Sequence, residues 1–182
     1  MNLINKNNVG RIAERIVSNE LESLGFRVSD LNSDGTSANA DLLAVRHEKV
    51  LQIQVKGATN TEKDRYWWVQ YGYCTDEIIK NRKKPMFNRR FSFYSADYVI
   101  LVAVRSPHDY CCVVLRVKEA ERAAQINIDR GYRHPRRDGK PKKPGKVWVK
   151  IDGSPKERKS SPLRDKERRI LRRNRDKWSN LI

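Results

Sequence analysis

The hydrophobic pattern of the first part of the chain predicts a helix. Apolar side chains recur at helical spacing over residues 8–25, at positions Val9, Ile12, Ala13, Ile16, Val17, Leu21 and Leu24. Asn8 suits the N-cap of this helix, and Gly25 suits its C-terminal stop. We therefore expect an amphipathic helix with one face packed on a core.

After this helix the period of the pattern changes to two, which is typical of strands. Strands are predicted at 26–31, 40–46 and 50–56, and a turn at 47–49 joins the last two as a hairpin. In the last strand the apolar set Leu51, Ile53 and Val55 should face the core. The set that should face a cleft or solvent is Val50, Gln52, Gln54 and Lys56.

The remaining pattern predicts further strands and helices. These are a strand at 66–71, a short helix at 75–81, strands at 96–105 and 110–117, a helix at 118–128, a loop at 131–145, an edge-like strand at 146–151 and a basic helix at 162–178. The strand at 96–105 is nearly all apolar, as expected when both faces are buried. This order favours an α/β fold with a mixed sheet of about four or five strands flanked by helices.

The net charge of +17 is concentrated at the C-terminal end of the 182-residue chain. Residues 1–129 hold 19 Lys and Arg against 16 Asp and Glu, a net of +3. Residues 130–182 hold 20 against 6, a net of +14. We interpret 1–129 as a core and 130–182 as a basic extension for nucleic acid, over the alternative of a solvated tail.

The sequence also indicates a cellular setting. No apolar run reaches the roughly 20 residues of a membrane span, and the N-terminus has no secretory h-region, so we expect a cytoplasmic protein that does not bind membranes. The three cysteines include no CxxC pair, so neither a disulfide framework nor a zinc site is predicted.

The candidate chemistry lies on the predicted hairpin. If Arg46 pairs with Lys49, Asp41 lies opposite Gln54 on one face, and its carboxylate neighbours that amide. If Arg46 instead pairs with the residue after Lys49, Asp41 points into the core, where a lone carboxylate is costly. The first register, or one shifted by an even number, is therefore favoured. It would gather oxygen ligands suited to Mg²⁺ or Mn²⁺ beside the Lys56 ammonium.

The first helix offers a further acid. Glu14 lies at the edge of the apolar stripe, from which it can reach the border between helix and sheet. Glu20 competes with it, because it falls near the centre of the stripe. An acid followed by Gln-x-Lys is weak evidence for a nuclease site when taken alone. The acid on the helix and the basic composition of the chain strengthen this evidence.

These motifs resemble the PD-(D/E)XK nuclease superfamily, in its Holliday-junction-resolvase-like and Mrr-like restriction endonuclease branch. The matching segments are 10–15 (GRIAER), 24–26 (LGF), 40–44 (ADLLA), 52–57 (QIQVKG) and 96–102 (ADYVILV). The resemblance covers roughly residues 8–105. It implies a restriction-endonuclease-like core of order αβββαβ that hydrolyses DNA with a metal ion, and enzymes of this superfamily often act as homodimers.

The resemblance also implies roles for residues. Glu14 would be the helix acid, Asp41 the central metal-binding acid, Gln54 the residue at the second acidic position and Lys56 the motif lysine. Ala40 stands where the motif has proline, and Gln54 stands where it has an acid. Gln-x-Lys resembles a variant of the Mrr-like branch, although it removes one negative charge from the metal site.

Basic clusters are candidate clamps for the DNA backbone. Their residues are Lys83, Lys84, Arg89, Arg90, Arg136, Arg137, Lys142, Lys143, Arg168, Arg169, Arg172 and Arg173. The basic helix is poor in apolar residues, which suggests that it orders only on DNA. The aromatic run Tyr66, Trp67 and Trp68 could stack on an unpaired base, but core packing is favoured.

The leading hypothesis is thus a Mg²⁺-dependent DNA endonuclease. The alternatives are a catalytically inactive nuclease fold that binds DNA, for which Gln54 is the best support, and a basic RNA-binding protein. The form of the DNA substrate is not encoded in these motifs.

Overall fold

A computed structural model describes most of the chain. The described residues are 8–32, 40–59, 66–73, 86–88, 93, 95–106, 108–133, 146–152 and 162–182. Within them, every helix is too short or too polar to cross a membrane.

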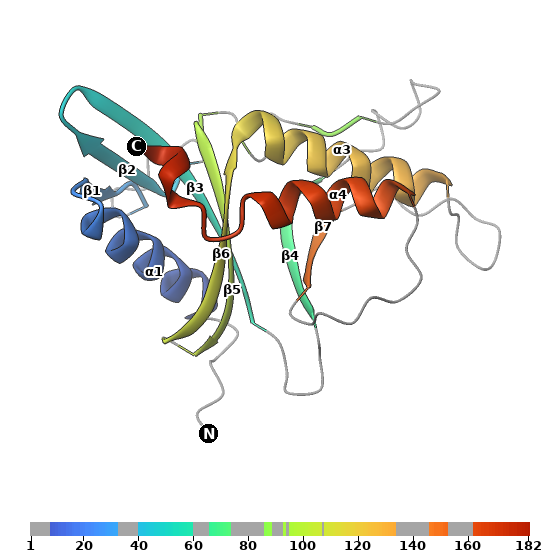
Figure 1. Cartoon of the computed structure of the whole chain (residues 1–182), viewed down its shortest axis with the longest axis horizontal. Helices are drawn as coiled ribbons and strands as arrows, with labels where there is room; N and C mark the ends of the chain where they lie inside the picture. The colour runs from blue at the N-terminus through green and yellow to red at the C-terminus, as the bar shows by residue number, and fades with distance from the viewer. Residues whose placement is uncertain are drawn as a thin grey trace.

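A five-stranded mixed sheet forms the centre of the described structure (Figure 1). Its strands, in spatial order, are β1 (Arg27–Asp30), β2 (Leu42–Arg46), β3 (Lys49–Thr59), β5 (Tyr98–Ser106) and β6 (Asp109–Arg116). β3 and β5 are parallel, and the other neighbours are antiparallel. The predicted mixed sheet flanked by helices is therefore confirmed. The helix expected at 75–81 lies outside the described residues.

Two further strands form a separate antiparallel ribbon. β4 (Tyr66–Tyr73) pairs with β7 (Lys146–Asp152). Both strands were predicted, but their pairing joins segments far apart in the sequence and had no sequence signal. The alternating face of the ribbon that holds Trp67, Val69 and Val149 is buried against the sheet.

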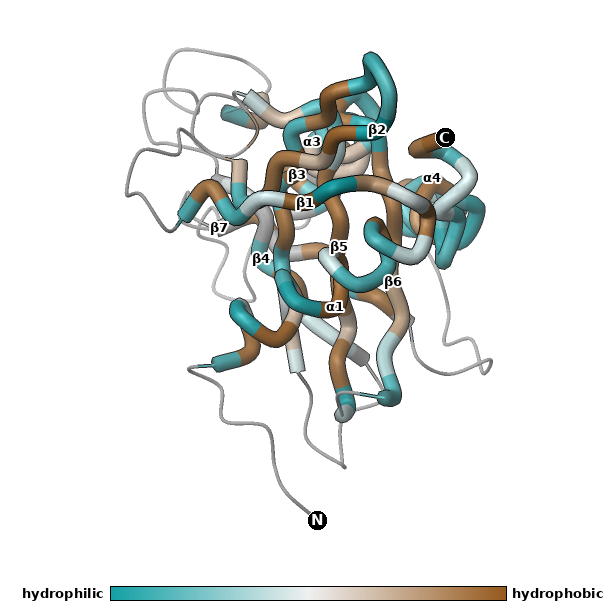
Figure 2. The backbone as a smooth tube through the Cα atoms, turned by 90° about the vertical axis from the view of Figure 1, so that its left-hand side faces the viewer, coloured by the Kyte–Doolittle hydropathy of each residue, from teal (hydrophilic) through white to brown (hydrophobic). Residues whose placement is uncertain are grey.

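Helices cover both faces of the sheet (Figure 1). α1 (Val9–Ser23) packs on one face, where it shares a core cluster with β2, β3 and β5. α3 (Val117–Arg133) and α4 (Pro162–Arg173) lie side by side on the other face, with the ribbon. In Figure 2 the hydrophobic colours gather along the strands between these layers.

Helix α1 ends where the sequence predicted. Gly25 has φ +83°, a left-handed conformation that costs glycine little. Its N–H donates to the carbonyl oxygen of Glu22 (2.9 Å), and the N–H of Phe26 donates to that of Leu21 (3.1 Å). This pair of hydrogen bonds is a Schellman motif, which turns the chain into β1.

The basic C-terminal segment is folded onto the body. The helix predicted at 162–178 ends at Arg173, and a 3-10 turn η3 (Trp178–Leu181) follows. Ile170 and Leu171 are buried together with Glu167 and Arg168, so this helix packs on the body through a face that is only half apolar. Helix α3 runs across the boundary expected at residues 129 and 130, so the two regions differ in charge but share a core.

Residues 174–176 close the outer edge of β6. The N–H of Val114 donates to the carbonyl oxygen of Asn174 (2.9 Å), and the N–H of Asp176 donates to that of Cys112 (2.8 Å). Beyond this edge, Leu181 is buried in the cluster that contains α1. The C-terminal segment therefore passes from one face of the sheet to the other.

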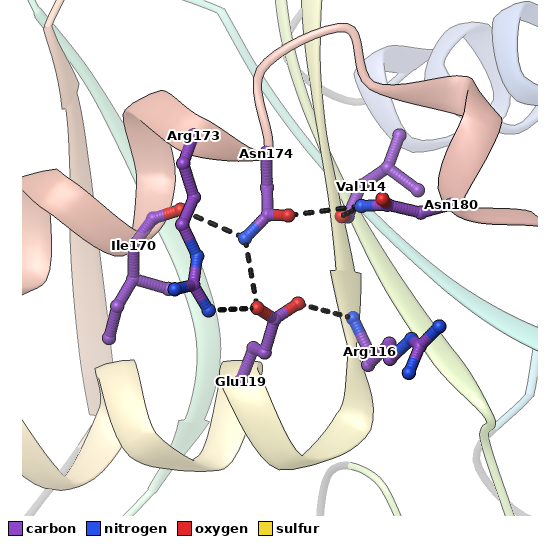
Figure 3. Close-up of polar contacts among 7 residues, drawn as sticks. All are labelled: Val114, Arg116, Glu119, Ile170, Arg173, Asn174 and Asn180. Atoms are coloured by element: carbon purple, nitrogen blue, oxygen red, sulfur yellow. Dashed lines mark hydrogen bonds and ion pairs between the residues drawn. The ribbon is translucent and has the colours of Figure 1, made fainter.

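Glu119, at the start of α3, holds this passage together (Figure 3). Its carboxylate accepts hydrogen bonds from Arg173, from Asn174 (3.3 Å) and from the backbone N–H of Arg116 (3.2 Å). Burial alone would raise the pKa of Glu119, but these hydrogen bonds outweigh it and lower the pKa. Asn180 donates to the side-chain oxygen of Asn174 (3.0 Å), which links η3 to the same cluster.

Candidate functional site

The hairpin register places the predicted acid beside the predicted amide. Arg46 pairs with Lys49 across a two-residue turn in which His47 has φ 52°. This is the first of the two registers considered, and it brings Asp41 opposite Gln54. The N–H of Asp41 donates to the carbonyl oxygen of Ile53 (2.9 Å), which holds Asp41 against β3 just before β2 begins.

Three hydrogen bonds fix the Asp41 carboxylate. Its Oδ2 accepts from Nε2 of Gln54 (2.5 Å) and from the backbone N–H of Val55 (2.6 Å). Its Oδ1 accepts from Nδ2 of Asn32 (3.2 Å). Gln54 itself is 3% exposed, so this amide is held in a largely dry environment. The carboxylate is thus presented in one orientation at the start of β2.

Sequence reasoning missed two residues of this neighbourhood. Asp30 ends β1, and its Oδ1 accepts from the N–H of Asn32 (2.7 Å), which forms an Asx turn. The same turn carries the Asn32 amide that reaches Asp41, and the N–H of Leu31 donates to the carbonyl oxygen of Asp41 (2.9 Å). The sequence signal was an Asp followed two residues later by Asn at a strand end, but it did not indicate which strand lies adjacent.

Helix α1 crosses close to β3 at Gly57, next to Lys56. A Cβ atom built on Gly57 would lie 2.7 Å from the Cβ of Ala13 and 2.9 Å from the carbonyl oxygen of Val9. Such distances are far shorter than van der Waals contact, so only glycine permits this approach. Glu14 follows Ala13 on the helix and is therefore brought to the part of β3 that carries Lys56.

Glu14 shares its electrostatic environment with the hairpin residues. The pKa of Glu14 is raised by burial first, then by the negative charges of Asp41 and Asp30. The positive charges of Lys56 and Arg11 oppose this shift. The structure therefore brings together the four residues singled out in the sequence (Glu14, Asp41, Gln54 and Lys56), with Asp30 as an additional acid.

The competing helix acid, Glu20, has a different environment. Its Oε1 accepts a hydrogen bond from the hydroxyl of Tyr110 on β6 (2.8 Å). This bond raises the pKa of Tyr110 to about 12, with burial as the next cause. Glu20 is thus accounted for by a contact with β6, away from the hairpin residues.

The donor set has the chemistry of a site for a hard cation. Carboxylate and amide oxygens are ligands that Mg²⁺ and Mn²⁺ accept, and Asp41, Glu14 and Gln54 supply them. A cation would also relieve the mutual repulsion of Glu14, Asp41 and Asp30. In the part of the chain that the structure describes, however, no three His, Cys, Asp or Glu side chains already form a metal-holding group.

The expected clamp residues have mixed outcomes. Eight of them, namely Lys83, Lys84, Arg89, Arg90, Arg136, Arg137, Lys142 and Lys143, lie outside the described residues. On α4, Arg169 and Arg172 are exposed, as is Arg173 although it pairs with Glu119. Arg168 is 7% exposed, so its side chain is not presented to a DNA backbone. Arg168 lies three residues before buried Leu171 and therefore on the same face of α4. The many basic residues of this segment gave no indication that position 168 lies on the buried face.

The aromatic run divides between core and surface. Trp67 is buried, and its Nε1–H donates to the carbonyl oxygen of Val104 (3.5 Å). Trp68, the next residue on β4, is 52% exposed. The expectation of core packing is confirmed for Trp67 and wrong for Trp68, because neighbouring residues of a strand face opposite sides.

Comparisons with known proteins add little to this geometry. No family model and no curated protein matches the chain. Among solved structures it is similar to the bacterial homing endonuclease I-Ssp6803I, with 16% identity, a TM-score of 0.49 and coverage of 93% of this chain and 94% of that one. It is also similar to MepB, with 14% identity, a TM-score of 0.31 and coverage of 82% and 83%. Both TM-scores are below 0.5, so the case for a function rests on the side chains.

Proposed function

We propose that this protein is a metal-dependent DNA endonuclease that hydrolyses phosphodiester bonds. The observation that carries the proposal is the Asp41 carboxylate, fixed by Gln54 and by the N–H of Val55, with Glu14 near enough to both Asp41 and Lys56 that their charges affect its pKa. This arrangement agrees with the resemblance to PD-(D/E)XK nucleases. The strongly basic composition supplies the attraction for a polyanionic substrate.

Each residue would have a distinct task. Asp41, with oxygen atoms of Glu14 and Gln54, would hold Mg²⁺ or Mn²⁺, and such an ion supplies Lewis acidity and a water of lowered pKa. The Lys56 ammonium would place positive charge beside the scissile phosphate and stabilise the charge that develops on it. The hydrogen bonds from Asn32 and from the N–H of Val55 would keep the Asp41 carboxylate aimed without help from substrate.

A cleavage screen tests the proposal. Purified protein is incubated with linear, nicked and four-way-junction DNA in Mg²⁺, in Mn²⁺ and in EDTA, and products are resolved on denaturing gels. We expect cleavage only with metal, and Asp41→Asn and Lys56→Ala should each lower the rate by at least about 100-fold, the usual cost of removing one charge-stabilising group. DNA affinity in EDTA should change little.

Glu22→Gln is the matched control for Glu14→Gln. Glu22 is exposed on the same helix, and its carboxylate accepts a hydrogen bond from the hydroxyl of Ser18. Glu14→Gln should slow cleavage, whereas Glu22→Gln should not. Wild-type rates in both Asp41→Asn and Lys56→Ala would reject the site assignment.

A second function, DNA binding without catalysis, is favoured by one observation. Both oxygens of Asp41 already accept hydrogen bonds, and the neutral Gln54 occupies the position where the resembling family has an acid. Gln54→Glu distinguishes the two functions. If the wild-type protein binds DNA in a salt-dependent manner, never cuts it, and Gln54→Glu gains both Mg²⁺ binding by calorimetry and cleavage, the inactive alternative is correct.

A further inference from the structure

The outer face of the β4–β7 ribbon presents an exposed tryptophan that the proposed active site does not use. Among the described residues, the exposed large hydrophobic side chains are Val50, Trp68, Met86 and Ile182, and of these only Trp68 carries a ring. It is 52% exposed at the middle of a paired strand. The position is neither a loop tip nor a chain end, where stray exposure is ordinary.

The ribbon under Trp68 is rigidly supported. Trp67, Val69, Val147, Val149 and Ile151 face the core and are each at most 5% exposed. An indole on such a base loses little conformational freedom when it binds, because its backbone is already fixed. The ribbon is therefore a preorganised platform for a flat ligand.

A cation accompanies the exposed ring. Lys150 is the direct cross-strand partner of Trp68, and its Nζ lies 5.6 Å from the ring centroid. The ammonium lies over the indole face, so a base that stacks on the ring would displace the flexible lysine to the edge of the ring. An indole with a mobile ammonium at its face suits a ligand that joins a flat π system to a negative charge, as a nucleotide does. A cationic ligand such as a methylated lysine is disfavoured by Lys150 and by the net charge of +17.

The ribbon also adjoins the strand that carries the candidate site. β4 contacts β3, and Ala58 of β3 lies in the same core cluster as Trp67. A polynucleotide held at the site could therefore extend onto the ribbon. In an intact duplex each base is already stacked and paired, so only an unpaired base can lie flat on the indole.

We propose that Trp68 and Lys150 form a stacking platform for an unpaired base of DNA, with the ring taking the base and the ammonium its phosphate. The naming of DNA rests on the proposed function, whereas the stacking itself does not require cleavage. The platform makes DNA with a nick, a flap, a bulge or a single strand the preferred substrate class over intact duplex.

Fluorescence anisotropy tests this in EDTA, where no cleavage occurs. The probes are a labelled single strand, the same strand in a blunt duplex and a duplex with one unpaired base. Trp68→Ala should weaken binding of the single strand and of the bulged duplex by about 5- to 150-fold, equivalent to about 1–3 kcal/mol for one stacked base. Binding of the blunt duplex should be unaffected, and Trp68→Phe should retain part of the preference.

Val50→Ala is the control, because Val50 is as exposed as Trp68 but lies on the β2–β3 hairpin. It should leave all three affinities unchanged, and thermal melting should confirm that both variants are folded. The inference is overturned if Trp68→Ala binds the bulged duplex as tightly as the wild type, or if binding of all three probes weakens equally. It is also overturned if the part of the fluorescence that Trp68→Ala removes is quenched by RNA or a neutral oligosaccharide but not by DNA. Assaying cleavage by the same wild-type protein separates the two proposals: a wild-type protein that never cuts DNA with Mg²⁺ or Mn²⁺ but binds it in a Trp68-dependent manner would refute only the nuclease.

Discussion

The close crossing of α1 over β3 makes Gly57→Ala a sharp test of how the candidate site is assembled. The added methyl group would lie 2.7 Å from the Cβ of Ala13 and 2.9 Å from the carbonyl oxygen of Val9. Overpacking of this kind costs about 1–3 kcal/mol, and stiffening of the unfolded chain offsets about 0.4–1 kcal/mol of it. The net loss should be about 1–2 kcal/mol, or about 2–8 °C in Tm for a chain of this length.

Gly10→Ala is the matched control, because a Cβ at Gly10 has no atom within 4 Å and Gly10 lies inside α1. This substitution should raise Tm, since alanine is about 0.5–1 kcal/mol better than glycine in a helix. Calorimetric melting of both variants measures the contrast. Shifts of Tm in the same direction for both variants would contradict a close contact at Gly57.

A double-mutant cycle locates the cause. Ala13→Gly removes the nearest clashing atom, so Gly57→Ala should cost less in that background, with a coupling of at least about 0.5 kcal/mol. Cleavage should follow the same order, because a displaced α1 moves Glu14 relative to Lys56. Additive effects on Tm would show that the clash lies elsewhere.

Two further predictions concern the packing of the helices. The hydrogen bond to Glu20 raises the pKa of Tyr110 from 10.0 to about 12, so between these pH values the folded protein keeps a proton that the unfolded chain loses. The contribution of this proton to stability is therefore complete below about pH 10 and is lost as the pH rises to about 12. Tyr110→Phe should flatten that loss in urea unfolding, and an unchanged slope would contradict it. Glu167 is 3% exposed and pairs with Arg130 at 2.9 Å, so Glu167→Ala should cost about 3–5 kcal/mol, while Asp109→Asn in an exposed pair should cost about 0–1 kcal/mol. Equal losses of unfolding free energy in the two variants would show that the pair between Glu167 and Arg130 contributes no more to stability than an exposed pair.

The local part of the fold was readable from the sequence. Alternation in 50–56 and the cost of burying a lone Asp41 favoured the register that the structure has, together with registers shifted from it by an even number. The helical stripe and Gly25 gave the extent of α1 to within two residues. These features depend on near neighbours in the sequence, and short-range chemistry decides them.

The rest depends on contacts between distant segments. The pairing of β4 with β7 and the meeting of Asn32 with Asp41 follow from the assembled sheet, so no local pattern could indicate them. The buried face of helix α4 could not be recognised from the sequence, because it contains Glu167 and Arg168 beside Ile170 and Leu171. The exposure of Trp68 was not predicted, because strand alternation shows only that Trp67 and Trp68 lie on opposite faces. It does not show which of the two faces the core.

The C-terminal segment, which closes the edge of β6 at residues 174–176, has a consequence for biosynthesis. Lys49 Nζ donates to the carbonyl oxygen of Leu181 (2.7 Å), and the hydroxyl of Tyr98 donates to the carbonyl oxygen of Asn180 (2.7 Å). β3 and β5 therefore cannot form these contacts until the ribosome has added residues far later in the sequence. Until then the nascent chain carries an open strand edge at β6, the kind of surface that other chains can pair with. Chaperone dependence during translation, and a drop in yield when residues 174–182 are deleted, are therefore expected of this topology.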